Sequence, residues 1–182
     1  SLPLSAGSQK ETFQTIIEET LGETCDIEVV KNIHDKLTEI TIPKSVTTVA
    51  LLVFHECNSL ENIYVEEGNA RYRDIGGVLL SDKGVLKMPP QNKTAILDLS
   101  DTAITYIDWQ AFRNCLYLEQ ILFPDTPDFH IDSMAFAGCT GLTVVSLPNN
   151  VTSIGIGAFR DCSNLTTIAI PDGITSIENS TF

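Results

Sequence analysis

The chain has 182 residues, of which 43% are hydrophobic and 19% charged, so it carries enough apolar side chains for a core and too little charge for an intrinsically disordered chain. Its formal net charge of −13 at pH 7 argues against nucleic acids and anionic membranes as partners, because no basic patch is available to displace their counterions. No apolar run approaches the roughly 20 residues that a membrane-spanning helix needs.

Residues 1–36 do not follow the pattern of the rest of the chain. Apolar side chains recur at helical spacing between Gln9 and Leu21, and Ser8 stands where a helix N-cap is expected. We interpret this segment as an N-terminal helical cap, or alternatively as the end of a preceding domain. Since the chain does not begin with Met and stops within a repeated motif, we interpret it as a mature or excised fragment.

From Leu37 onward the sequence repeats itself. Leu37 to Ser59 and Leu142 to Asn164 are both 23 residues long and share the pattern L-x-x-I-x-I-P-x-x-V-x-x-I-x-x-x-A-F-x-x-C-x-x. Further units begin near residues 60, 94, 118 and 165, which assigns residues 37–182 to one repeat domain. Because one unit is too small to bury its own apolar side chains, the units are expected to stack into a solenoid.

The unit that begins at Leu142 shows what each position is expected to do. Alternation over residues 142–147 predicts a short strand, which Pro148 ends because it cannot donate a further ladder bond. A second inward-facing stretch follows at 151–154, and the Ala158-Phe159 pair predicts a tight helical turn. The matching rings are expected to fill the space between coils in single file: Phe54, Phe112, Phe136 and Phe159.

The unit that begins at Leu60 is interrupted by an insertion, residues 66–93. Two apolar runs, 78–80 and 85–88, flank the turn sequence Ser81-Asp82-Lys83-Gly84, which predicts a β-hairpin. We expect this hairpin to replace the helical turn of one repeat; the alternative is a dedicated binding lobe. At the other end, the unit from Leu165 would leave an uncovered apolar coil, so either further repeats follow in a longer protein or this face associates with another copy.

Residues that carry chemistry do not converge in this sequence. Four of the five cysteines share one repeat position and are expected to be buried and reduced, because a column of side chains points in one direction; bridges between coils are the alternative. No metal-ligand spacing, catalytic motif or cofactor fingerprint is present, so we predict no enzyme activity, metal or cofactor. Four sequons matter only in a eukaryotic protein and otherwise reflect loop composition: Asn92, Asn150, Asn164 and Asn179.

Binding is expected at outward positions, which packing leaves free to vary. On the first strand of successive units, four of these positions are apolar and one at the edge is acidic, as in a protein-binding patch: Tyr64, Ile96, Leu122, Val144 and Asp98. The alternative is that the 66–93 hairpin folds over part of this strip.

A second outward site precedes each Ala-Phe pair. It holds the only tryptophan, Trp109, together with Met134 and Ile156. Trp109 is a candidate for contact with a protein partner, and the alternative is that it packs against the adjacent coil.

The signature I-x-I-P-x-x-V-x-x-I-x-x-x-A-F-x-x-C resembles the leucine-rich repeats of the BspA-like surface proteins, the Treponema pallidum type. The resemblance implies an α/β repeat fold, a right-handed solenoid of parallel strands with helical turns. It also implies a bacterial or protist protein, at the cell surface or secreted, that binds a protein or glycan on host or neighbouring cells without catalysis. The alternative function is a structural spacer or stalk that presents another domain.

Overall fold

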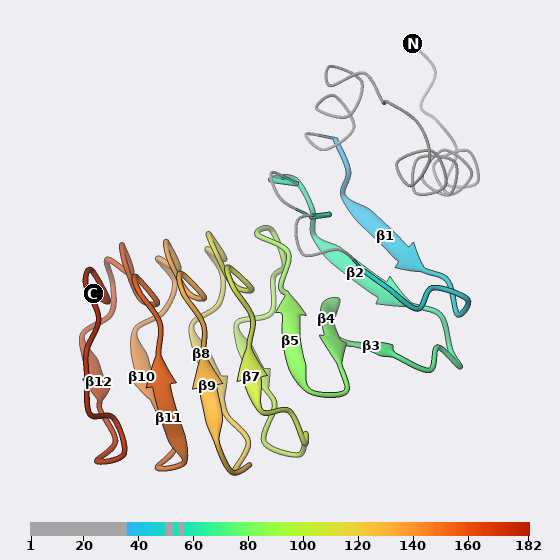
Figure 1. The fold of residues 1–182 in the computed structure, drawn as a ribbon. Helices are drawn as coiled ribbons and strands as arrows, with labels where there is room; N and C mark the ends of the chain where they lie inside the picture. Colours follow the sequence, from blue (N-terminus) through green and yellow to red (C-terminus); the bar gives the residue numbers. More distant parts are fainter. Residues whose placement is uncertain (1–35, 50–52, 55–56) are drawn as a thin grey trace.

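The computed structural model of the chain describes residues 36–49, 53–54 and 57–182. This part of the chain winds into a stack of coils made of short strands (Figure 1). In chain order the strands are β1 (Glu39–Ile42), β2 (Asn62–Val65), β3 (Tyr72–Ile75), β4 (Val78–Ser81), β5 (Gly84–Lys87), β6 (Ile96–Asp98), β7 (Tyr106–Ile107), β8 (Gln120–Leu122), β9 (Phe129–Ile131), β10 (Val144–Ser146), β11 (Val151–Ile154) and β12 (Thr167–Ala169).

The first strands of successive coils form one outer face of the stack. β1 pairs in parallel with β2, β6 with β8, and β10 with β12. β8 and β10 are joined at one end, where Thr143 N donates to Glu119 O at 3.5 Å. In β6, β8 and β10 the middle residue is buried and both neighbours are exposed, so the predicted strand alternation is confirmed.

The second outer face is a six-stranded sheet in the order β11-β9-β7-β5-β4-β3. β5, β7, β9 and β11 run parallel, one from each coil, whereas β3, β4 and β5 form an antiparallel meander. The predicted hairpin is therefore present as β4–β5. The expectation from the sequence that this hairpin replaces the helical turn of one repeat is wrong. β5 itself supplies the first parallel strand of this face, and β3 and β4 are inserted ahead of it in the chain.

The Ala-Phe segments are turns, and the described part of the chain contains no helix, so the helical turns expected from the sequence are wrong. The N–H groups of Ala111 and Arg113 donate to carbonyls three residues earlier. Those of Gln110, Phe112 and Asn114 donate instead to the next coil. A helix would keep every one of these donors for its own carbonyls. The fold is therefore a parallel-strand solenoid, and the predicted N-terminal helical cap lies outside the described residues.

Backbone conformation interrupts the helical path as well. The rings in question are Phe112, Phe136, Phe159 and Phe182. The residue two positions before each of them has a left-handed φ between 54° and 64°, and a second left-handed residue lies two positions after the first three. Left-handed residues do not continue a right-handed helix. The first set comprises Gln110, Met134, Gly157 and Ser180.

Stacked rings run through the main core. Phe136 stacks between Phe112 and Phe159 with centroids 4.7 and 5.1 Å away, and Phe182 continues the file at 6.2 Å from Phe159. Phe54 is not in this file, contrary to the prediction, and lies in a separate core cluster with residues of β1 and β2. The coil between them carries Lys87-Met88 at the Ala-Phe position, so no ring connects the two clusters.

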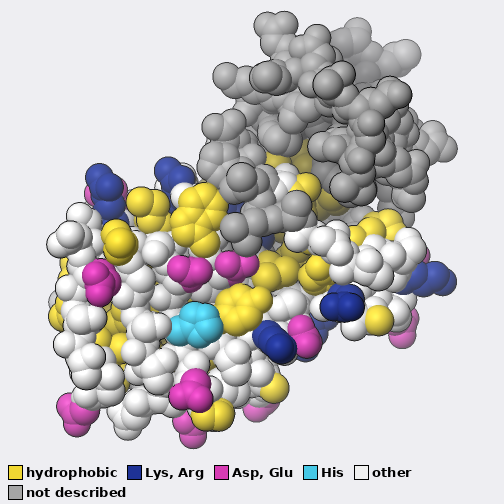
Figure 2. All heavy atoms as spheres, viewed as in Figure 1, with side chains coloured by type: hydrophobic (Ala, Val, Ile, Leu, Met, Phe, Trp, Pro, Cys, Tyr) yellow, Lys and Arg dark blue, Asp and Glu magenta, His cyan; other side chains and the backbone are white. Residues whose placement is uncertain are grey.

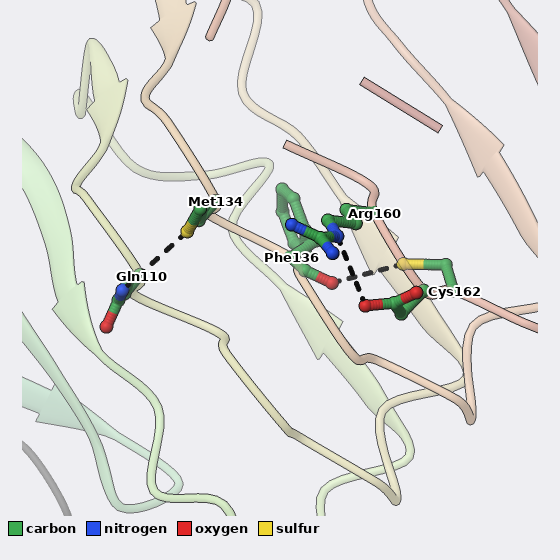
Figure 3. A network of polar contacts seen from close by, with 6 residues as sticks. Gln110, Met134, Phe136, Arg160 and Cys162 are labelled. Atoms are coloured by element: carbon green, nitrogen blue, oxygen red, sulfur yellow. Dashed lines mark hydrogen bonds and ion pairs between the residues drawn. The ribbon is translucent and has the colours of Figure 1, made fainter. Parts of the chain in front are cut away.

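The cysteine column lies beside the rings. Cys139 Sγ donates to Phe112 O at 2.8 Å, and Cys162 Sγ donates to Phe136 O at 3.1 Å (Figure 3). Cys115 makes the equivalent contact with Met88 O at 3.4 Å. These three thiols form no disulfide, as predicted, and each donates to a carbonyl of the preceding coil. Cys25 lies outside the described residues.

Candidate functional site

The first outer face carries the apolar outward residues predicted from the sequence. Ile96, Leu122 and Val144 lie on the adjacent strands β6, β8 and β10 and are 56%, 37% and 46% exposed. The parallel register places Asp98 directly beside Leu122. We call Ile96, Asp98, Leu122 and Val144 the outer strip. The 66–93 insertion leaves these side chains exposed.

Tyr64 is 40% exposed but stands apart from the outer strip. Its strand, β2, pairs with β1 and not with β6. Asn92 ties β2 to the β3–β4 turn, because its Nδ2 donates to Glu61 O at 3.0 Å and to Gly76 O at 2.8 Å. The structure therefore brings four of the five predicted first-face residues together and leaves Tyr64 beyond the turn.

Asp98 carries the charge of the outer strip. Its carboxylate accepts bonds from Ser100 Oγ at 2.6 Å and Ser100 N at 2.9 Å. These bonds lower the pKa of Asp98, the side-chain bond being the larger cause. The strip thus combines exposed aliphatic side chains with a fixed negative charge at its edge.

The second face holds a group of side chains that the sequence did not single out as a site. Tyr106 on β7 and His130 on β9 occupy the same register position, and their rings are 5.4 Å apart at 19°. Two residues further along, on the same side of the sheet, follow Asp108 and Asp132. We call these four residues the ring–acid cluster; Figure 2 shows the histidine beside a hydrophobic ring, with two acidic side chains next to them. The signal in the sequence was an aromatic followed two residues later by Asp in neighbouring repeats.

Trp109 follows Asp108 and is half-buried at the edge of the ring–acid cluster. Its backbone N–H donates to Asp108 Oδ1 at 2.7 Å. The sequence prediction grouped Trp109 with Met134, but Met134 belongs to the next position of the repeat. There it contacts Gln110, whose Nε2 lies 3.8 Å from Met134 Sδ (Figure 3).

The last coil is open on one side. Phe182 and Ile177 are 55% and 56% exposed. A groove of about 310 Å³ lies between Phe159, Leu165, Ile168 and Phe182.

A metal site, a membrane span and a glycosylation site each have requirements that can be compared with the described residues. They contain no group of three His, Cys, Asp or Glu side chains placed to hold a metal ion, and no helix long and apolar enough to cross a bilayer. Among the sequons, Asn92 is buried, and the amides of Asn150 and Asn164 donate to carbonyls of the preceding coil. Those side chains therefore serve the stacking of coils.

Comparison with known families locates two matches. The BspA type leucine-rich repeat region matches residues 92–182 with six copies, which is half of the chain. A domain of unknown function matches residues 1–69. No curated protein matches the chain.

The solved structures that resemble this chain include leucine-rich repeat proteins. The chain is similar to a leucine-rich repeat protein from Eubacterium ventriosum (25% identity, TM-score 0.69), to the pneumococcal vaccine antigen PcpA (26%, 0.60) and to a leucine-rich cell surface protein from Faecalibacterium prausnitzii (27%, 0.54). The matches cover 79%, 76% and 80% of this chain. They cover only 38%, 40% and 46% of those proteins, so the chain corresponds to less than half of each relative.

Proposed function

Because this chain belongs to the BspA-type leucine-rich repeat family, whose members' fold suits protein interaction, we propose that it is a non-catalytic binding module that holds a protein partner on its outer strip. The observation that carries the proposal is the exposure of Ile96, Leu122 and Val144 on three adjacent strands. Aliphatic side chains at solvent-facing strand positions cost solubility unless a partner covers them.

Surface display is part of the same proposal. One relative is described as a cell surface protein and another as a vaccine antigen. We infer that this chain is likewise exported, at the cell surface or secreted, and that its partner is a protein on host or neighbouring cells. Adhesion in this sense requires only a rigid scaffold with an exposed contact face, which stacked coils provide.

A binding assay with matched variants tests the proposal. The chain is applied to a panel of purified extracellular matrix proteins, surface proteins of neighbouring microbes and glycans. The strip variant carries Ile96→Ser, Leu122→Ser and Val144→Ser. The control carries Leu116→Ser and Tyr117→Ser, which remove apolar side chains of comparable exposure, 45% and 39%, elsewhere on the surface.

We expect the strip variant to lose at least about tenfold in affinity for the captured protein, because buried apolar anchors dominate protein interfaces. The control should bind like the unchanged chain. Equal binding by the two variants would exclude the outer strip as the site. Failure of every probe to bind the unchanged chain would favour the alternative, a spacer that presents another domain.

A further inference from the structure

We propose that the ring–acid cluster on the second face is a separate binding site, which takes an arginine side chain of a protein partner. The site lies on β7 and β9, and the outer strip lies on β6, β8 and β10. The two proposals are therefore independent, and variants of one face leave the other unchanged.

The rings form a shelf on the sheet surface. A Cβ atom added at Gly84, which neighbours Tyr106 in the register, would come within 2.3 to 2.5 Å of three atoms of the Tyr106 ring. Because such a Cβ would point outward from the sheet, the ring lies across Gly84 and turns its other face to solvent. His130 lies next to it and is exposed, and on its far side the register places only Ser153.

The acids beside this shelf lack a cation. Among the described residues, Asp108 and Asp132 form no ion pair, and each carboxylate accepts a bond only from the backbone N–H of the residue that follows it. Burial raises the pKa of Asp108 and is the largest cause; the backbone bond from Trp109 lowers it, the negative charge of Asp132 raises it, and His130 lowers it. The pair thus concentrates negative charge that a bound cation would relieve.

Lys83 does not fill this role. Lys83, which precedes Gly84, has its carbonyl bonded to Tyr106 N. The register therefore places Lys83 at the end of the rings away from the carboxylates. The overall charge of −13 adds a field that attracts cations and repels anionic ligands.

A guanidinium fits this arrangement better than other groups do. It is planar and weakly hydrated, so it stacks on aromatic faces, and it donates in a fork to carboxylates. A lysine ammonium is attracted to the same charges but cannot stack in this way. A neutral ligand would gain nothing from the two carboxylates.

The single tryptophan of the chain, Trp109, directly follows Asp108 and donates its backbone N–H to that carboxylate, so its fluorescence serves as the reporter. Its fluorescence is followed while the full chain is titrated with acetyl-Gly-Arg-Gly-amide. The same peptide with citrulline, a neutral analogue of arginine, or with lysine serves as the comparison. The variants are Asp132→Asn, Tyr106→Ala and His130→Ala, and Asp101→Asn is the matched control, an exposed acid outside the cluster.

We expect a saturable fluorescence change with the arginine peptide, weaker binding of lysine and weakest binding of citrulline. Asp132→Asn should weaken arginine binding about two- to fivefold, the range for an exposed ion pair, and raising the salt concentration should do the same. The ring variants should weaken it by a similar factor. Asp101→Asn and the strip variant should bind like the unchanged chain.

Three results would overturn the proposal. The first is no saturable change. The second is equal binding of the arginine and citrulline peptides, which would indicate a site for neutral ligands such as glycans. The third is an equal loss in Asp132→Asn and Asp101→Asn, which would indicate attraction to the overall charge only. Because Tyr106→Ala can disturb the sheet, the urea unfolding midpoint of this variant is measured as well. If that midpoint is lowered, the binding results of His130→Ala and Asp132→Asn decide the test.

Discussion

At the scale of single residues, the ring file carries much of the packing of the array. Phe136 is fully buried and stacked on both sides, whereas Phe182 is stacked on one side and half exposed. We expect Phe136→Ala to lower the free energy of unfolding by about 3–5 kcal/mol and Phe182→Ala by less than about 1.5 kcal/mol. Urea unfolding measures both. Equal losses would mean that the file does not carry the packing.

The cysteines allow a second prediction at this scale. Burial raises the pKa of Cys162 to about 11 and raises that of the more deeply buried Cys139 as well. The thiolate is the reactive form, so about a thousandth of Cys162 is ionised at pH 8. Alkylation by iodoacetamide, resolved by peptide mass spectrometry, should accelerate about tenfold per pH unit between pH 8 and 10 at Cys162. At Cys139 it should require unfolding.

The same shift links stability to pH. Since the folded pKa of Cys162 lies above that of an unstructured thiol, about 8.5, the linked stability is fully present below that pH and is lost as the pH rises toward about 11. Labelling of Cys162 at pH 8 as fast as in a denatured control would contradict the raised pKa on which both predictions rest.

At the scale of elements, the β3–β4 turn is tightly constrained. Gly76 and Gly77 both have left-handed φ, 57° and 80°, as a two-residue hairpin turn requires. A Cβ at Gly77 would meet Asn62 Oδ1 at 2.4 Å and Asn92 Nδ2 at 2.9 Å, whereas one at Gly76 has only Thr94 Oγ1 at 3.4 Å. The second glycine is therefore required by packing as well as by conformation.

We accordingly expect Gly77→Ala to destabilise the chain by about 1–3 kcal/mol, through strain and displacement of Asn92. Gly76→Asn should change the stability by less than about 1 kcal/mol, because Asn tolerates a left-handed conformation. Thermal unfolding of the two variants is the measurement. A larger loss in Gly76→Asn would show that the Asn62–Asn92 contact is dispensable.

At the scale of the whole molecule, net charge dominates the electrostatics. The chain carries −13 charges, and the described residues contain one ion pair, Arg160–Asp161, at 3.4 Å between exposed side chains. Repulsion among carboxylates therefore opposes the compact state. We expect the melting temperature to rise by a few degrees between about 10 and 200 mM NaCl, with KCl giving the same rise. A fall would mean that attractive pairs outweigh the repulsion.

Much of this architecture could be predicted because it is local in sequence. Alternation in Leu142–Leu147 identifies a strand and its buried side, and the repeated Phe and Cys positions identify two columns. The outer strip followed from the same reasoning, since outward positions alternate with buried ones. The pairing of Tyr106 with His130 was not predicted, because it depends on the register between coils and neither residue belongs to the repeated signature.

What the sequence alone determined about this protein is the repeat, the inward and outward side of each strand, and the stacking of equivalent residues. Tertiary structure alone decided that the Ala-Phe segments are turns, because every second N–H bonds to the neighbouring coil and no spacing within a coil specifies that partner. It also decided that Phe54 leaves the ring file and that β5 joins the second face. Hydrogen bonds between coils, which link residues more than twenty positions apart, made these choices.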